Sequence, residues 1–97
     1  MKVFFIGMMG SGKTTLAKKL SELMNKSYVD IDDLIELKEN MSISEIFSNY
    51  GEDYFRKIEN ITLRSIGNSE IIACGGGIII NKNNRKFLKE NGFTIYL

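Results

Sequence analysis

The sequence lacks histidine and proline altogether and has only one cysteine, Cys74, among its 97 residues. Without histidine there can be no His-based catalytic triad, no histidine-ligated metal or haem, and no imidazole switch near neutral pH. A lone cysteine forms neither an intramolecular disulfide nor a cysteine-rich zinc site. We therefore expect Cys74 to be a small buried hydrophobic residue. The lack of proline also leaves no proline-rich linker.

An excess of charge of one sign and a long apolar run are missing as well. The 13 Lys and Arg residues face 12 Asp and Glu residues, which argues against a nucleic-acid-binding surface. No apolar run approaches the roughly 20 residues of a membrane-spanning helix. The apolar stretch 3–9 is short and has no A-x-A cleavage pattern, so it is not typical of a signal peptide. We expect a soluble, cytoplasmic chain that binds neither nucleic acid nor membrane.

The composition is that of an ordinary globular protein. Hydrophobic residues make up 43% of the chain and aromatic residues 10%, which argues against wholesale disorder. The length allows a single small domain, residues 1–97. Such a domain buries roughly 60–70% of the surface that the unfolded chain exposes.

The hydrophobic periodicity switches several times between a strand-like and a helix-like pattern, which is typical of an α/β fold. The pattern predicts strands at residues 2–6, 27–30, 70–74 and 93–97. The helix after the first strand has a predicted apolar stripe of Leu16, Leu20, Leu23 and Met24. Such spacing places the stripe on one helical face. A second helix, of one or two turns, is expected at residues 32–39.

The third predicted helix has a clear beginning and end. Ser42 and Glu45 stand in the positions of a capping box, so Ser42 is expected to start the helix. Its apolar face would carry Ile43, Ile46 and Phe47. Gly51 is expected to break it.

Two further helices follow. The spacing of Tyr54, Ile58 and Ile61 indicates a longer helix, which we expect to end at a left-handed cap over residues 67–68. Asn81 can cap a helix over residues 82–91, and Gly92 would stop it.

The first turn carries a phosphate-binding motif, since Gly7-Met8-Met9-Gly10-Ser11-Gly12-Lys13-Thr14 matches G-x-x-x-x-G-K-[ST] in full. Glycines let backbone N–H groups point at phosphate oxygens. A lysine there puts positive charge on the terminal phosphates, and a threonine hydroxyl can ligate Mg²⁺. The following helix aims its positive end at the same anion. The predicted nucleotide-binding residues are Gly10, Ser11, Gly12, Lys13, Thr14 and Thr15.

A second carboxylate near Mg²⁺ is usual in P-loop NTPases. The strand predicted at 27–30 ends in Asp30, and Asp32 follows two residues later. If the chain is extended there, both carboxylates point to one side, so one could serve the metal and the other a substrate hydroxyl. Alternatively, Asp30, Asp32 and Asp33 merely cap the next helix.

The order of the motifs resembles the N-terminal part of the shikimate kinase family, in the nucleoside-monophosphate-kinase-like branch of P-loop proteins. The resemblance runs over residues 3–97 through the phosphate loop, Asp30-Ile31-Asp32, Phe55-Arg56-Lys57-Ile58-Glu59 and Gly75-Gly76-Gly77. It implies a three-layer α/β/α fold of the P-loop NTPase type. Four strands of the parallel sheet would be present here, and a fifth would lie beyond residue 97.

The resemblance also implies roles for individual residues. Asp32 would bind ring hydroxyls of shikimate beside the attacking hydroxyl, and Asp30 would join the Mg²⁺–water network. Arg56 would pair with the shikimate carboxylate, Gly76 would offer a backbone N–H, and Glu59 would orient Arg56 or a ring hydroxyl. Phe47 and Phe55 would shape the pocket wall. The implied substrate-binding set is Asp32, Arg56, Glu59, Gly75, Gly76 and Gly77, and the implied shikimate-binding region is about 32–66. The implied catalytic residues are Lys13 and Asp32, and the implied metal ligands are Thr14 and Asp30.

The residue types suit these roles. Arg56 and Glu59 are neighbours on a helical face, and a guanidinium can bind a carboxylate through two parallel hydrogen bonds. Glycines at 75–77 would let the backbone approach a small polar ligand. Alternatively, Arg56 and Glu59 are an ordinary surface pair, and the glycines are an ordinary strand-to-helix turn.

The resemblance further implies segments that the 97 residues do not contain: a lid arginine over the phosphates, a second arginine for the shikimate carboxylate, an adenine-binding loop and the fifth strand. After the glycines the only arginine is Arg85. We therefore expect a C-terminally truncated kinase domain with doubtful activity. The last strand could instead be an edge strand that finishes the domain. The family is expected to be monomeric, but an exposed sheet edge could allow this chain to self-associate.

The expected function is ATP-dependent phosphorylation of a shikimate hydroxyl, with Mg²⁺ as cofactor and ATP, ADP and shikimate as partners. This reaction belongs to the chorismate route of aromatic amino-acid biosynthesis. One alternative is another small-molecule P-loop kinase, such as a gluconate kinase. A second is a non-catalytic nucleotide-binding module.

Overall fold

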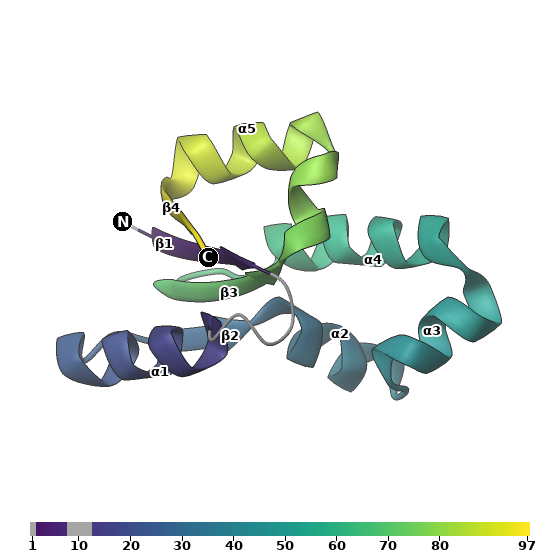
Figure 1. Cartoon of the computed structure of the whole chain (residues 1–97), viewed down its shortest axis with the longest axis horizontal. Helices are drawn as coiled ribbons and strands as arrows, with labels where there is room; N and C mark the ends of the chain where they lie inside the picture. Colours follow the sequence, from purple (N-terminus) through teal and green to yellow (C-terminus); the bar gives the residue numbers. More distant parts are fainter. Residues whose placement is uncertain (1, 8–12) are drawn as a thin grey trace.

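The computed structural model describes residues 2–7 and 13–97, without the side chains of Lys13 and Thr14. Figure 1 shows the elements along the chain. They are β1 (Lys2–Gly7), α1 (Lys13–Met24), β2 (Tyr28–Asp30), α2 (Ile31–Glu39), α3 (Ile43–Tyr50), α4 (Glu52–Arg64), β3 (Ile71–Gly75), the 3-10 helix η1 (Gly76–Ile80), α5 (Lys82–Asn91) and β4 (Gly92–Tyr96). The described residues thus contain all four predicted strands.

The sheet has the order β2-β3-β1-β4, and all of its pairings are parallel. Each connection between parallel strands passes through at least one helix, as such connections require. The first and third strands lie in register, with Val3 opposite Ile71 and Gly7 opposite Gly75. Both strands therefore finish at the same level of the sheet.

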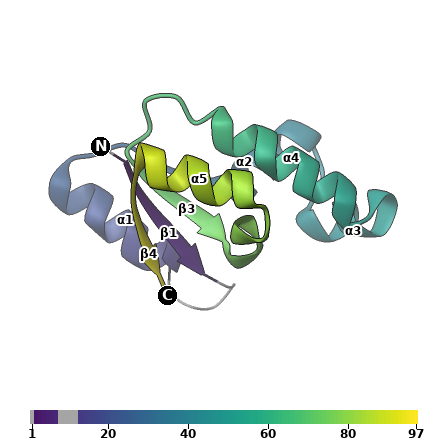
Figure 2. The same ribbon diagram turned by 90° about the horizontal axis from the view of Figure 1, so that it is seen from above.

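Helices cover both faces of the sheet, which gives the expected three layers (Figure 2). Side chains alternate along the strands, so Phe4 and Ile6 belong to one buried cluster and Phe5 to the other. The larger cluster lies under α4 and α5 and includes Ile72, Cys74, Leu63, Ile78 and Leu88; the smaller lies under α1 and includes Ala17, Ile71 and Ala73. Cys74 is fully buried, as predicted.

The predicted apolar stripe of α1 is wrong about which side chains face the sheet. Ala17 is fully buried there, and Leu20 is half-buried. In contrast, Leu16 is 46% exposed, Leu23 85% and Met24 50%. The small Ala17 side chain lets the helix approach the sheet closely, so the contact line passes beside the leucine stripe.

The chain is not extended from Asp30 to Asp32, which corrects the prediction that both carboxylates point to one side. Helix α2 begins already at Ile31, and Asp30 is its N-cap, accepting a hydrogen bond from the Asp33 N–H at 3.2 Å. A carboxylate that binds this backbone N–H stabilises the helix start. Asp32 therefore lies in the first helical turn.

Helix α3 begins and ends where the sequence predicts. Ser42 Oγ accepts from the Glu45 N–H, and Glu45 Oε1 accepts from the Ser42 N–H, both at 3.1 Å. The helix stops before Gly51, whose φ of 86° lies in the left-handed region. Few residues other than glycine adopt this conformation readily.

Helix α4 ends earlier than predicted, and of the three residues whose spacing indicated it Tyr54 and Ile58 pack against the core but Ile61 does not. It finishes at Arg64, and the left-handed Gly67 (φ 59°) lies in the following turn instead of at the helix cap. Ile61 is 49% exposed, and the fully or nearly buried side chains are Phe55, Glu59, Thr62 and Leu63. Glu59 shares this buried face, which brings a charged group into the interior.

The C-terminal third follows the prediction with one addition. Gly75 ends β3, and Gly76 and Gly77 begin η1, which the sequence pattern did not predict. Asn81 then caps α5 as predicted, its Oδ1 accepting from the N–H groups of Asn83 and Asn84. Strand β4 begins at Gly92, where an added Cβ would overlap the carbonyl of Lys2.

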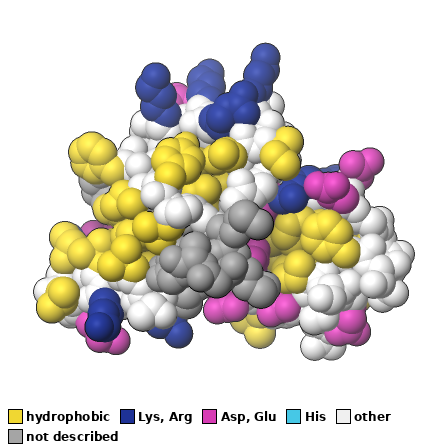
Figure 3. All heavy atoms as spheres, viewed as in Figure 1, with side chains coloured by type: hydrophobic (Ala, Val, Ile, Leu, Met, Phe, Trp, Pro, Cys, Tyr) yellow, Lys and Arg dark blue, Asp and Glu magenta, His cyan; other side chains and the backbone are white. Residues whose placement is uncertain are grey.

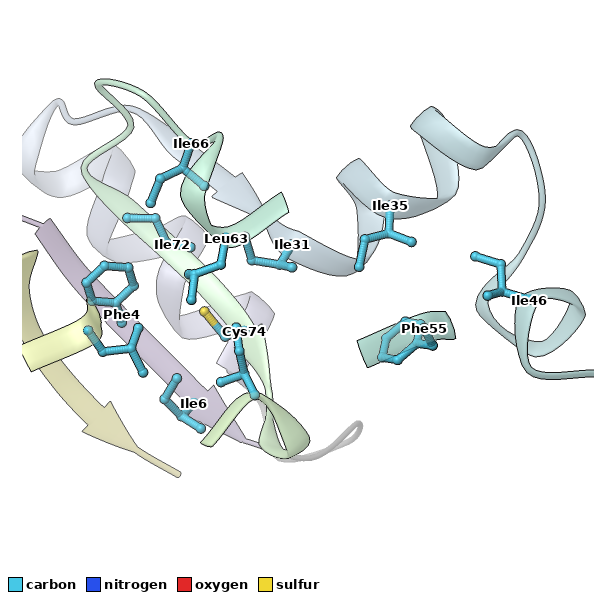
Figure 4. Close-up of a cluster of buried hydrophobic side chains, with 12 residues drawn as sticks. Phe4, Ile6, Ile31, Ile35, Ile46, Phe55, Leu63, Ile66, Ile72 and Cys74 are labelled. Atoms are coloured by element: carbon cyan, nitrogen blue, oxygen red, sulfur yellow. The ribbon is translucent and has the colours of Figure 1, made fainter. Parts of the chain in front are cut away.

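The helices α2, α3 and α4 form an arm that extends beyond the carboxyl ends of the strands (Figure 1). The buried cluster continues into this arm through Ile35, Ile46 and Phe55, which lie together in Figure 4. The arm therefore stands next to the strand ends, where the sequence predicts the site.

Within the described part of the chain, no helix is both long and apolar enough to cross a membrane.

Candidate functional site

The predicted site residues meet at the carboxyl end of the sheet. The register pairs Gly7, the first residue of the phosphate-loop motif, with Gly75, the first of the three glycines. Asp30 ends β2 opposite Ala73. Ligands of open parallel sheets bind outside the carboxyl ends of the strands. The phosphate loop, the glycines and the aspartates thus begin at one edge.

Asp32 lies against residues 75–77, which we call the glycine turn. A Cβ built on Gly75 would lie 3.8 Å from Asp32 Oδ2 and 3.9 Å from Oδ1. The Asp32 side chain is half-buried, and its Oδ1 atom is buried from solvent. The first turn of α2 therefore holds a carboxylate beside the backbone that follows β3.

Arg56 reaches the same turn from α4. Its Nη1 donates to Glu59 Oε1 at 3.0 Å, and its guanidinium lies so close to Gly77 that an added Cβ would overlap Nη1, Nη2 and Cζ. Only a glycine permits this approach. The Arg56 side chain remains 29% exposed, so a cationic group faces the solvent beside Asp32 and the glycines.

Burial shapes the electrostatics of this pair. Burial raises the pKa of Glu59 above its ordinary value; the hydrogen bond and charge of Arg56 oppose this effect, and the charge of Asp32 adds to it. Partial burial alone would lower the pKa of Arg56, but the carboxylates of Glu59 and Glu52 outweigh it and raise that pKa. Arg56 stays charged, and burial disfavours the charged form of Glu59.

Glu52 is a contact residue that the sequence reasoning missed. Its Oε2 accepts from Arg56 Nε at 3.3 Å, whereas Glu59 accepts from Nη1. The i, i+4 spacing of Glu52 and Arg56 was a visible signal for such a pair. The two glutamates leave Nη2 of Arg56 as the group not engaged by either carboxylate.

An aromatic pair borders the arginine. The rings of Phe47 and Phe55 lie 4.8 Å apart, and the Arg56 Cζ atom lies 5.2 Å from the Phe55 ring centre. Phe47 is 38% exposed, whereas Phe55 is nearly buried. Together they form an apolar surface beside the polar group; that these residues line a substrate pocket is what the resemblance implies.

The other predicted residues are only partly placed. Gly10, Ser11 and Gly12 lie outside the described residues, as do the side chains of Lys13 and Thr14, whose backbone begins α1. Thr15 is exposed in the first turn of α1. Gly76 begins η1, between the two glycines that Asp32 and Arg56 approach.

Asp30 is the described carboxylate that suits a magnesium role. It ends a strand at the edge where the phosphate loop begins, and oxygen is the ligand that Mg²⁺ prefers. In residues 2–7 and 13–97 no three His, Cys, Asp or Glu side chains cluster closely enough to hold a metal by themselves. Proteins usually bind Mg²⁺ through one or two carboxylates plus substrate phosphates, so Asp30 fits that pattern.

The parallel sheet and the phosphate loop between β1 and α1 define the class, which is the P-loop NTPase type of α/β protein. A family model for shikimate kinase matches residues 9–97. The chain belongs to the shikimate kinase family.

Individual relatives agree with this assignment. The chain is 44% identical over 97 residues to the shikimate kinase of Sulfurihydrogenibium sp. (strain YO3AOP1), covering 98% of this chain and 58% of that protein. The crystal structure of shikimate kinase from Aquifex aeolicus has a TM-score of 0.92 and 35% identity over all of this chain and 59% of its own. Shikimate kinase from Acinetobacter baumannii in complex with shikimate has a TM-score of 0.92 and 38% identity, over 99% of this chain and 55% of its own. The chain thus spans somewhat more than half the length of these relatives.

Proposed function

We propose that this chain carries the phosphate-loop and acceptor-binding parts of a shikimate kinase, which transfers a phosphoryl group from ATP to a shikimate hydroxyl. The products would be 3-phosphoshikimate and ADP, a step in aromatic amino-acid biosynthesis. One observation carries the proposal: Arg56 lies against Gly77 with Glu59 on one side of it and Asp32 close by. The shikimate named with the Acinetobacter baumannii relative supports the choice of acceptor.

We assign the shikimate carboxylate to Arg56. A planar guanidinium can offer two parallel N–H groups to a carboxylate, which lysine cannot do. Glu52 engages Nε and Glu59 engages Nη1, so the parallel pair would come from the second N–H of Nη1 and an N–H of Nη2. Backbone N–H groups of the turn 75–77 would assist, and Gly76 would donate one of them. Phe47 and Phe55 would cover the apolar ring face.

We assign the reacting hydroxyl to Asp32. Its carboxylate could accept the hydroxyl proton or hold the hydroxyl in line for attack. Phosphoryl transfer needs positioning and positive charge more than covalent chemistry from the protein. Lys13 would provide part of that charge. Backbone N–H groups of the phosphate loop and of the start of α1 would cradle the phosphates. The residues assigned to this part of the site are Gly10, Ser11, Gly12, Thr14 and Thr15.

Mg²⁺ belongs to the same proposal. Bound with ATP, the ion would neutralise charge that develops on the transferred group. The Thr14 hydroxyl would ligate it, and Asp30 would act through the surrounding water. The N-cap role of Asp30 fixes this carboxylate at the end of β2, which supports the assignment.

The domain limits and the location are part of the proposal too. We propose that residues 1–97 are one part of a kinase domain, with the shikimate-binding region at about 32–66. Cys74, the only cysteine, is buried in the core, which suits the reducing cytoplasm. Fractionation of cells that produce the chain tests that location.

The first test is ADP formation from MgATP with and without shikimate. Stimulation by shikimate that is lost in Lys13→Ala and in Asp32→Asn supports the kinase proposal. The family resemblance implies a phosphate-clamping arginine beyond residue 97, and such a group contributes about 10³–10⁵ in rate.

The alternatives predict different results in the same assay. A kinase for another small molecule, such as gluconate, would be stimulated by that acceptor and not by shikimate. A non-catalytic nucleotide-binding module would bind ADP with no acceptor-dependent turnover and no affinity for shikimate. Gluconate also carries a carboxylate, so the Arg56–Gly77 contact suits either acceptor; the shikimate named with the Acinetobacter baumannii relative is what favours shikimate.

A further inference from the structure

A buried asparagine joins three elements behind the site. Asn84, in the first turn of α5, is 1% exposed. Its Nδ2 donates to the carbonyl of Ile78 at 3.1 Å and to Asn60 Oδ1 at 2.5 Å. Its Oδ1 accepts from Arg64 Nη1 at 2.8 Å. Both donors and the acceptor of this amide are therefore used, and they reach α4, η1 and α5.

Arg64 strengthens the same junction from its exposed side. Its Nη1 also donates to the Asn60 carbonyl at 2.9 Å, and its Nη2 donates to the Asn83 carbonyl at 3.3 Å. The guanidinium lies 5.2 Å from the centre of the Phe87 ring. An open hollow of about 270 Å³ borders the junction and is lined by Asn60, Ile61, Arg64, Asn81 and Asn83.

This network lies one residue away from both halves of the candidate site. Asn60 follows Glu59, which holds Arg56, and Ile78 follows Gly77, against which Arg56 lies. The contact between Arg56 and Gly77 is a packing contact without a hydrogen bond of its own. The separation between α4 and η1 must therefore be set by other groups, and Asn84 bonds to both segments directly.

We propose that Asn60 and Asn84, with Arg64, are positioning residues that fix the distance between Arg56 and the glycine turn and thereby set the affinity for the acceptor carboxylate. The inference rests on the proposed function, because it assumes that Arg56 and the turn bind shikimate. A misplacement of about 1 Å can cost on the order of 10²-fold in rate at a catalytic site. Arg64 is exposed and Asn60 is only half-buried, so we expect the smaller loss of about three- to tenfold in shikimate affinity.

Asn60 offers a matched pair of variants. Asn60→Leu removes the oxygen that accepts from Asn84 Nδ2, whereas Asn60→Asp keeps an acceptor oxygen at that place. Asn83→Ala is the control, because Asn83 is the exposed neighbour of Asn84 and contributes only backbone groups to the network. The affinities for shikimate and for ADP are measured by calorimetry on all four proteins.

Asn60→Leu is expected to weaken shikimate binding about three- to tenfold while ADP binding stays as in the wild type. Asn60→Asp and Asn83→Ala should bind both ligands like the wild type. The proposal is overturned if Asn60→Leu binds shikimate normally, if it loses affinity for both ligands equally, or if Asn60→Asp fails to restore binding.

Amide hydrogen exchange separates this inference from the proposed function. If the wild type binds no shikimate, the proposed function fails, and exchange at Gly77 and Ile78 still tests the positioning role. Faster exchange at these amides in Asn60→Leu, but not in Asn60→Asp, supports the network as the device that holds η1. Equal exchange in the three proteins overturns it.

Discussion

Two neighbours fix the position of the Arg56 guanidinium: the carboxylate of Glu59 and the backbone of Gly77. Glu59 holds its Nη1 through a hydrogen bond of 3.0 Å, and the missing Cβ of Gly77 leaves the space that the guanidinium fills. A methyl group at residue 77 would compete with the guanidinium for this space. The position of the arginine is therefore sensitive to a single carbon atom.

Gly77→Ala is expected to raise the dissociation constant for shikimate at least about tenfold, which corresponds to about 1.4 kcal/mol. The added Cβ must displace Arg56 from its place between Glu59 and the turn. Calorimetric titration with shikimate measures the change.

Gly67→Ala is the control for Gly77→Ala. Gly67 has a φ of 59° and no atom within 4 Å of an added Cβ, so this variant should lose about 1–2 kcal/mol of stability but keep its shikimate affinity. Normal affinity in Gly77→Ala, or equal losses in both variants, would contradict the account of Arg56.

The raised pKa of Glu59 makes the stability of the protein depend on pH. Burial is the main cause of the raised pKa, so the native state binds this proton more tightly than the unfolded state. As pH rises from about the ordinary value through the raised pKa, the wild type loses stability. Glu59→Gln keeps an oxygen for Arg56 but cannot titrate.

The melting temperature of Glu59→Gln minus that of the wild type is therefore expected to become more positive as pH rises through this window. Thermal unfolding followed by circular dichroism at a series of pH values measures the difference. A difference that is constant with pH, or that falls as pH rises, would show that the pKa of Glu59 is not raised.

At the residue scale, the sequence predicts which residues belong to the site better than it predicts which side chains touch one another. The side chains of Asp32 and Arg56 approach Gly75 and Gly77, and the motif pattern predicted that they belong to one site. The Glu52 contact follows from helical spacing and could have been found. Asn84 could not, because an asparagine among lysines in α5 looks like part of a solvated face until tertiary contacts bury it.

At the scale of elements, capping side chains set helix boundaries that the sequence shows directly. The reciprocal bonds of Ser42 and Glu45 begin α3, and Asn81 begins α5. Both are local interactions between residues a few positions apart, so they can be read before the fold is known. Helix α3 packs against α4, which carries Arg56, so the cap of α3 contributes to the stability of the arm.

Ser42→Ala is expected to lower the free energy of unfolding by about 1 kcal/mol, since it removes the acceptor for the Glu45 N–H. Urea denaturation followed by circular dichroism gives the value. Ser48→Ala, an exposed serine of the same helix, should change it by less than about 0.5 kcal/mol. Equal effects of the two substitutions would argue against the capping box.

The buried faces of helices were harder to predict than their boundaries. In α1 the contact with the sheet passes over Ala17 and not over Leu23, and in α4 it passes over Glu59 and Thr62 and not over Ile61. Hydrophobic spacing identifies a stripe, but the neighbouring layer decides which side of the stripe is covered. One boundary also differed: α2 begins at Ile31, one residue before its predicted start at residue 32, because Asp30 caps it.

At the scale of the whole molecule, a parallel sheet covered by helices follows from the alternating pattern of the sequence, whereas the strand order β2-β3-β1-β4 was not predicted. The surface of the described residues also has an exposed apolar region over α1 and β4 (Figure 3). Exposed side chains there include Leu23, Met24, Phe93, Tyr96 and Leu97. In the described sheet β4 is an edge strand beside β1, so its outer hydrogen-bonding groups can pair with another strand.

The 97-residue polypeptide is therefore expected to self-associate as its concentration increases. Light scattering over a range of concentrations measures the molar mass. Ile95 is 40% exposed on β4. The variant Ile95→Glu or Ile95→Lys should shift the polypeptide toward the monomer. A wild-type monomer at every concentration contradicts the prediction.

The central claim is that Arg56 binds the carboxylate of shikimate at the glycine turn, and a double comparison tests it most directly. The affinities of wild type and Arg56→Lys are measured by calorimetry for shikimate and for its carboxamide, which lacks the negative charge. We predict that the wild type prefers shikimate strongly, and that Arg56→Lys loses affinity for shikimate but little for the carboxamide. Equal losses for both ligands, or a wild type that does not distinguish them, would contradict the account.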